Sequence, residues 1–228
     1  MIELADLLPL TVLGAVLGLD VVSFPQMMIS RPLVAATLGG AFVGAPVSGL
    51  VTGVVLELVA LETLPFGASR YPEWGSASVV GGALFASQTG DRPGAMVLAV
   101  VAALASAWVG GWTMVMLRRL NALWARWHRA SLDAGSYRTV VGLQIFGLTA
   151  DLLRAAMLTW TALLLLGPAV AGLLRLWALD MRISRAVVVG AAAAIAVGAV
   201  WKLFHLTPGA RWLFLGGLAA GFVLLVLR

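Results

Sequence analysis

Long apolar runs, interrupted by very few charged residues, dominate this chain and limit what it can fold into. Of its 228 residues, 61% are hydrophobic and 11% are charged, whereas roughly a quarter of the residues are charged in an ordinary soluble domain. This composition leaves too little polar surface to cover a soluble core. It excludes a disordered chain and almost every soluble enzyme, and with no cysteine it also excludes a disulfide-rich secreted domain. We therefore expect an integral membrane protein.

The apolar runs are continuous rather than alternating, which favours spanning helices over the strands of a membrane barrel. Since one span takes about 20 residues, the apolar content sets a ceiling of about eight spans, and about six or seven with some shorter pieces are expected. No polar linker is long enough to join two domains. The expected fold class is therefore all-α, a polytopic transmembrane helical bundle in a single domain over residues 1–228.

Two unlike regions divide this domain. Residues 1–93 hold several short apolar pieces separated by prolines and charges, as at Arg31-Pro32 and Ala45-Pro46. Transporters use short, proline-broken or re-entrant helices to place helix ends and unwound backbone at a site inside the membrane. We therefore expect the substrate site in this region, with ordinary loops between short helices as the alternative. Most of residues 94–228 is typical of conventional spans.

Residues 118–138 form a basic connector between two of these spans, with five arginines and one acid, Asp133. Arginine accumulates in the cytoplasmic loops of membrane proteins, so we expect the connector in the cytoplasm, as a helix lying at the membrane interface. A second basic cluster begins at Arg175. A single span between the two clusters would put them on opposite sides, so a hairpin over residues 140–170, broken at Gly167-Pro168, is an open alternative.

Some charges stand inside apolar runs, where an acid at the centre of a spanning helix costs about 2.5–3.5 kcal/mol. Glu57 fits either an ion pair with Arg31 or Arg154, or a ligand for a polar substrate or a proton. Asp151 and Arg154 are three residues apart on one expected helix, and we expect a structural ion pair. Glu62 adds another acid five residues after Glu57, on a different helix face.

A polar loop is expected over residues 65–78, with Glu73 and Trp74 inside it. A carboxylate beside an aromatic ring suits the hydroxyls and the apolar face of a sugar, although a tryptophan near a membrane surface is more commonly an interface anchor. No phosphate-binding Gly-Lys-Ser/Thr loop occurs, which excludes an ATPase. The two histidines have no metal-ligand partners near them in the sequence, so we expect no metal site.

A family resemblance covers roughly residues 14–80. The chain resembles the IIC membrane component of the mannose/fructose/sorbose-type sugar phosphotransferase system. The residues that carry the likeness are the run SRPLVAATL over 30–38, Gly44, Gly49 and Gly53, then Leu56-Glu57-Leu58, and Gly67-Ala68 to Pro72-Glu73. The basic connector and the helix that carries Arg154 are similar to the family's second half.

The resemblance implies a sugar-translocating subunit in the inner membrane of a bacterium. Its partners would be a second membrane subunit, IID, and the cytoplasmic proteins IIA and IIB, in an oligomeric complex that binds no nucleic acid. IIB carries a phosphohistidine and phosphorylates the incoming sugar, so IIC itself needs neither a phosphoryl-acceptor residue nor a cofactor. The substrate-binding residues that the resemblance implies are Glu57, Glu73, Gln26, Arg31, Gly67 and Ala68.

Two other functions stay open at this point. Ser30, Glu62 and Pro65 differ from residues common in the family, which favours a membrane scaffold or regulatory subunit that docks IIB-like proteins without transporting sugar. Glu57 and Asp151 could also relay protons in a proton-coupled carrier.

Overall fold

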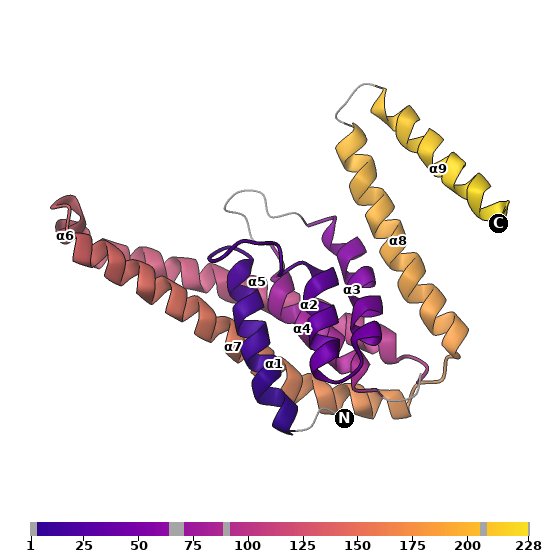
Figure 1. The fold of residues 1–228 in the computed structure, drawn as a ribbon, viewed down its shortest axis with the longest axis horizontal. Coiled ribbons are helices and arrows are strands. Elements are labelled where there is room, and N and C mark those ends of the chain that lie inside the picture. Colours follow the sequence, from indigo (N-terminus) through magenta and orange to yellow (C-terminus); the bar gives the residue numbers. More distant parts are fainter. Residues whose placement is uncertain (1–3, 64–70, 89–91, 206–208, 228) are drawn as a thin grey trace.

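The computed structural model describes residues 4–63, 71–88, 92–205 and 209–227, and the regular secondary structure in these ranges is entirely helical. The predicted all-α helical membrane bundle is confirmed. The helices are α1 Leu4–Asp20, α2 Pro32–Phe42, α3 Pro46–Ala60, α4 Trp74–Ala86, α5 Ala95–Trp127, α6 Arg129–Asp133, α7 Tyr137–Arg175, α8 Met181–His205 and α9 Ala210–Val226. Figure 1 shows α1 to α4 side by side at the centre of the molecule.

Three helices among the described residues are long and apolar enough to cross a membrane, namely α5, α7 and α8. This number is smaller than the six or seven spans that the apolar content predicts. The difference arises because much of the apolar sequence lies in α2, α3, α4 and α9, which have between 11 and 17 residues. A helix of 15 residues is only about 22 Å long, against about 30 Å for a hydrocarbon core.

Prolines set the starts of two of the short helices. Pro32 and Pro46 are the first residues of α2 and α3, where a missing N–H costs nothing and a fixed φ favours the helix. Between the two helices the chain turns at Gly44, whose φ is +82°. The structure therefore confirms the predicted break between two helices at Ala45-Pro46.

The predicted loop over residues 65–78 is wrong in its second half, because α4 begins at Trp74. A buried acid, Glu73, caps the first turn of α4: its side chain accepts a hydrogen bond from the backbone N–H of Ser76 at 3.0 Å. Acids favour this position because they satisfy N–H groups that have no partner within the helix. Because Glu73 caps this start, residues 74–78 form the first turn of a helix although their sequence is typical of a loop.

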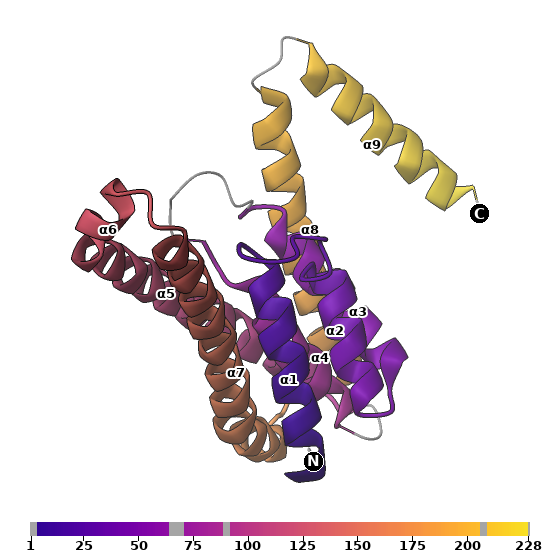
Figure 2. The ribbon, with the colours of Figure 1, turned by 60° about the vertical axis from the view of Figure 1, so that its left-hand side comes forward.

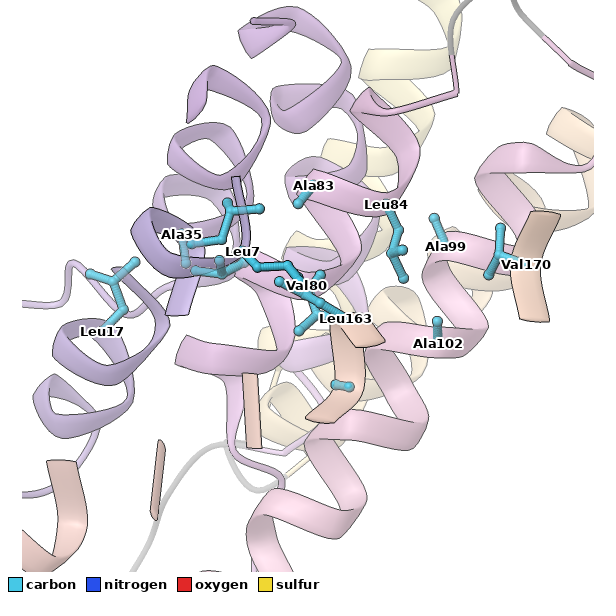
Figure 3. Close-up of a cluster of buried hydrophobic side chains, with 13 residues drawn as sticks. Leu7, Leu17, Ala35, Val80, Ala83, Leu84, Ala99, Ala102, Leu163 and Val170 are labelled. Atoms are coloured by element: carbon cyan, nitrogen blue, oxygen red, sulfur yellow. The ribbon is translucent and has the colours of Figure 1, made fainter. Parts of the chain in front are cut away.

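Helix α4 lies at the centre of the bundle, in contact with α1, α2, α3, α5 and α7. Figure 3 shows part of the main hydrophobic cluster, in which Val80 and Leu84 of α4 lie with Leu7 of α1, Ala99 of α5 and Leu163 of α7. Eleven of the 13 residues of α4 are buried. A helix too short to cross the bilayer is thus surrounded by protein, which satisfies its ends.

Small residues let α4 approach its neighbours at backbone distance. A Cβ at Gly82 would lie 2.1 Å from the carbonyl oxygen of Ala36 in α2, far inside van der Waals contact. The contacting atom belongs to the backbone, so it cannot rotate away. Gly82 therefore sets how closely α2 and α4 pack, as small residues do in many membrane helix pairs.

We expect Gly82→Ala to destabilise the protein by about 1–3 kcal/mol, the usual cost of overpacking a close-packed interior. Thermal unfolding of the purified protein, followed by helical circular dichroism, measures this loss. Gly217→Ala in α9 is the matched control, because a Cβ there meets nothing within 4 Å. Equal melting temperatures for the two variants would contradict the assigned α2–α4 packing.

Helices α5 and α7 form a long antiparallel hairpin with α6 at its tip, which extends to one side of the bundle in Figure 1. The basic connector is therefore not a separate helix. Most of it continues α5 or begins α7, and only the five residues of α6 lie between them. The predicted hairpin over residues 140–170 is also wrong, because α7 runs unbroken through Pro168. The two basic clusters lie at opposite ends of α7.

The last two helices extend away from the bundle on the other side, as Figures 1 and 2 show. Helix α8 packs on α3 and α5, whereas α9 contacts only α8 among the described helices. No residue of α9 is buried within this chain. An apolar helix of 17 residues thus keeps most of its surface, apart from its contact with α8, available to lipid or to another subunit.

Candidate functional site

A cavity of about 300 Å³ lies where the ends of the short helices meet. The C-terminal ends of α1 and α3 and the N-terminal ends of α2 and α4 surround it. Its lining residues are Asp20, Val21, Gln26, Met28, Ser30, Arg31, Pro32, Ala60, Thr63 and Trp74. Two of the predicted substrate residues, Gln26 and Arg31, thus meet in one cavity. Gly67 and Ala68 lie outside the described residues.

Asp20, the last residue of α1, shapes the segment that carries Gln26 and Arg31. It is 2% exposed. Its two carboxylate oxygens accept hydrogen bonds from the backbone N–H of Met27 at 2.7 Å and of Ser30 at 2.9 Å. Gln26 and Met28 both have positive φ values, 59° and 62°, a conformation that residues other than glycine seldom adopt. The two hydrogen bonds to the buried Asp20 carboxylate compensate for this backbone strain and hold residues 27–30 close to the end of α1.

We expect Asp20→Ala to loosen this segment, because two buried N–H groups lose a charged acceptor. A hydrogen bond to a charged group contributes about 1.5–3 kcal/mol. The rate of protease cleavage within residues 21–31 of the purified protein measures the effect. Asp180→Ala is the control: Asp180 also accepts a backbone hydrogen bond, from Ile183 at 2.8 Å, but at an exposed helix start. Matching cleavage rates in the two variants would argue against this role.

Arg31 and Glu57 form an ion pair that joins the start of α2 to the end of α3. The second carboxylate oxygen of Glu57 accepts a hydrogen bond from the backbone N–H of Leu33 at 3.1 Å. The acid therefore also caps the first turn of α2, where negative charge is favourable. Of the two roles that the sequence leaves open for Glu57, the structure shows the pairing with Arg31. Arg31 lines the cavity, and Glu57 lies behind it.

Trp74 and Thr63 form another part of the wall. The indole Nε1 of Trp74 donates a hydrogen bond to the hydroxyl of Thr63 at 3.2 Å. Trp74 also packs against a buried cluster that includes Val55 and Leu56 of α3 and Val100 of α5. The structure thus places Trp74 in the cavity wall. An indole, an amide and a guanidinium together suit a ligand with hydroxyl groups and an apolar face.

Glu73 does not line this cavity, although it was predicted to bind substrate. Its side chain is 1% exposed and fills the space between Gly18 of α1 and Gly110 of α5, where added Cβ atoms would lie 3.5 Å and 2.7 Å from its atoms. Its backbone N–H donates to the carbonyl of Ala107 at 2.9 Å. Within the part of the chain that the structure describes, its Oε2 has no hydrogen-bond partner. Glu73 therefore anchors the start of α4 to α5.

Asp151 and Arg154 form a buried pair on α7, with 2.8 Å between the guanidinium Nε and a carboxylate oxygen. The hydroxyl of Ser23, in the segment after α1, donates to the other oxygen of Asp151. Arg154 also reaches the hydroxyl of Thr113 on α5 at 3.4 Å. The network connects the α5–α7 hairpin to the segment that holds Gln26.

Sequence reasoning missed Asp20 and Thr63 as parts of this site. A signal for Asp20 was present: it is an acid inside an apolar run over residues 7–22, the same criterion that singled out Glu57. Thr63 carries no comparable signal, since a lone threonine at the end of an apolar run has many ordinary explanations.

Comparisons with known proteins place these observations in a family. The family described as "PTS system sorbose-specific iic component" matches residues 5–227. A curated relative, the fructose permease IIC component of Bacillus subtilis (strain 168), is 31% identical over 146 residues, which cover 64% of this chain and 51% of that protein. The chain thus aligns with about half the length of this relative.

Two solved structures share the fold. A structure of a membrane protein matches with a TM-score of 0.75 at 19% identity, and the cryo-EM structure of the mannose transporter ManYZ in complex with microcin E492 matches with a TM-score of 0.63 at 20% identity. Each match covers 97% of this chain and 88% of the other. At 19% and 20% identity, these matches show that the helices are arranged in the same way, and they show the fold alone.

Proposed function

The chain belongs to the sorbose-specific IIC family of the phosphotransferase system, and from this premise we propose that it binds a hexose-type sugar and passes it inward for phosphorylation by IIB. It is a multi-pass membrane protein and a sugar-specific IIC permease component. Its own residues supply binding and passage, and the phosphoryl group comes from another protein of the system.

The observation that carries this proposal is the cavity at the ends of α1 to α4. Its volume of about 300 Å³ is at the lower end of the range typical of small-molecule sites. Gln26 and Arg31 offer hydrogen bonds to sugar hydroxyls, and the Trp74 indole offers a face for the apolar side of the ring. Glu57 keeps Arg31 in place and balances its charge. A neutral, hydroxyl-rich ligand fits this wall better than an ion does.

Directional transport then follows from chemistry outside this chain. A sugar released toward the cytoplasm becomes charged when IIB phosphorylates it, and a phosphate ester cannot recross the apolar bilayer. We propose the inner membrane of a bacterium as the location. The partners would be a IID subunit within the membrane and IIA and IIB in the cytoplasm. The largely exposed surface of α9 would give a second membrane subunit an apolar helix to pack against.

The direct test is sugar phosphorylation that depends on phosphoenolpyruvate. Membranes that contain this chain and its IID subunit, supplied with IIA, IIB and the general phosphotransferase proteins, are expected to phosphorylate at least one hexose, hexosamine or ketose. Membranes without this chain are the control. If a complex of verified composition phosphorylates none of these sugars, the proposed function fails. Uptake of unphosphorylated sugar driven by a proton gradient would instead support the carrier alternative.

A further inference from the structure

The carboxyl group of Glu73 is buried where α1, α4 and α5 meet, and capping α4 uses only one of its two oxygens. The side chain is 1% exposed. Its Oε1 accepts a hydrogen bond from the backbone N–H of Ser76 at 3.0 Å. Its Oε2 has no hydrogen-bond partner in the part of the chain that the structure describes. A carboxylate with one bare oxygen is costly to bury, because nothing replaces the water that a negative charge loses.

The space around Oε2 is closely packed and apolar. A Cβ added to Gly110 of α5 would lie 3.3 Å from Oε2 and 2.8 Å from a methyl carbon of Leu158 on α7. A helical glycine and an aliphatic side chain provide no side-chain donor to an ionised oxygen. Glu73 also does not line the cavity at α1 to α4. The charge of an ionised Glu73 would therefore be poorly compensated by its nearest neighbours.

The charged residues on the surrounding helices do not balance Glu73 either. On α7, Asp151 and Arg154 pair with each other at 2.8 Å. At the end of α1, Asp20 is another buried acid. On α5 the first charged residue is Arg118, eight residues, or about 12 Å along the helix, beyond the glycine that contacts Glu73. Helix α4 itself carries no charged residue. One arginine thus stands among three buried acids.

Arg154 gives a second indication that Glu73 is neutral. It is close enough to Glu73 for the two to interact electrostatically. Its buried Nη2 has no hydrogen-bond partner among the described residues, as is also true of the Glu73 Oε2. An ionised carboxylate would offer this group a charge-assisted hydrogen bond, which is about twice as strong as a neutral one. Instead, Arg154 bonds to Asp151 and to the hydroxyl of Thr113.

We propose that Glu73 is a buried binding site for a proton, and that its carboxyl group is neutral at pH 7. A proton on Oε2 removes the buried charge, while Oε1 continues to accept the hydrogen bond from Ser76. Apolar sites keep carboxylic acids protonated at this pH in other proteins. The neutral acid also leaves Arg154 to Asp151. Without the proton, two buried carboxylates would compete for one guanidinium group. None of these steps depends on the proposed transport function.

The test uses the full-length chain purified from membranes, with ¹³C in the side-chain carboxyl groups of its glutamates. Infrared spectroscopy at pH 7 separates the carbonyl stretch of a protonated carboxyl group from the bands of ionised ones, and the label identifies glutamate. The chain has four glutamates, Glu3, Glu57, Glu62 and Glu73. Glu73→Gln removes the proton site and keeps the shape of the side chain. Glu62→Gln is the matched control, because Glu62 is paired with Lys202.

We expect a labelled band of a protonated carboxyl group that Glu73→Gln reduces at least tenfold and Glu62→Gln leaves unchanged. A labelled protein without this band at pH 7 would overturn the proposal, as would a band that Glu73→Gln leaves in place. If Glu73→Gln does not fold, the unsubstituted protein still decides, since a glutamate in water is ionised at pH 7. The measurement needs neither sugar nor the other proteins of the system, so its result is independent of the phosphorylation assay.

Discussion

Replacing Arg154 with leucine is expected to destabilise this protein more than Gly82→Ala does. The partner carboxylate of Asp151 is 1% exposed and lies 2.8 Å from the Arg154 Nε. Without the guanidinium, the buried carboxylate of Asp151 keeps only the Ser23 hydroxyl as a side-chain donor among the described residues. Breaking a buried pair by removing one partner costs about 3–5 kcal/mol, because the remaining charge is left without compensation. Chemical or thermal unfolding in detergent measures this loss.

Two further variants test whether the loss of stability comes from the burial of the unpaired charge. Arg129→Leu breaks an Arg–Asp pair that also lies on one helix, but its side chains are 81% and 72% exposed, so the expected cost is at most about 1 kcal/mol. Adding Asp151→Asn to Arg154→Leu should recover part of the lost stability, since it removes the uncompensated charge. A double variant that is less stable than Arg154→Leu alone would show that charge compensation is not the cause.

Replacing Glu57 with glutamine is expected to reduce sugar transport at least tenfold while leaving the helical bundle assembled. Glutamine cannot balance the charge of Arg31, and it keeps at best a weaker hydrogen bond to the N–H of Leu33. Losing an interaction of a charged group, at about 1.5–3 kcal/mol, corresponds to roughly tenfold to hundredfold in affinity or rate. The side chains of Arg31 and Glu57 are 34% and 22% exposed, so stability should change much less. Initial rates of sugar uptake measure the effect.

Glu62→Gln is the matched control for this variant. Glu62 lies five residues after Glu57 and is paired with Lys202 of α8, outside the lining of the cavity at α1 to α4. Its transport rate is expected to stay within about twofold of the unchanged protein, because exposed ion pairs contribute little. Normal transport by Glu57→Gln would remove the Arg31–Glu57 pair from the mechanism. Intact complexes with no transport before any substitution would favour the scaffold alternative.

Local patterns predicted those parts of the fold that depend on single residues. Pro32 and Pro46 mark helix starts because a proline restricts the residues around it whatever the rest of the chain does. Asp151 and Arg154 lie three apart on one helix, and contact between them requires only that the helix forms. Membership of the family could likewise be inferred from one continuous stretch, since its motif residues are close in sequence.

Features that depend on distant parts of the chain could not be predicted in this way. Glu73 looks like a loop residue, and its role as a buried cap needs Ser76, Gly18 and Gly110 around it. The basic connector was expected at the interface because of its charge. Its arginines, leucines and alanines are also good helix formers, and in the structure they extend α5 and α7 into one hairpin. Composition could not show that these residues continue two long helices.

The short central helices have a further consequence for passage through the membrane. With 11, 15 and 13 residues, α2, α3 and α4 are about 16–22 Å long, while the hydrocarbon around the protein is about 30 Å thick. If water enters at both ends of these helices, it approaches from the two faces to within a distance shorter than the bilayer thickness. Any membrane voltage would fall across this narrower layer, so the local electric field would be about one and a half times that in the surrounding lipid. Arg31 and Glu57, at the ends of these helices, lie at the edge of that field.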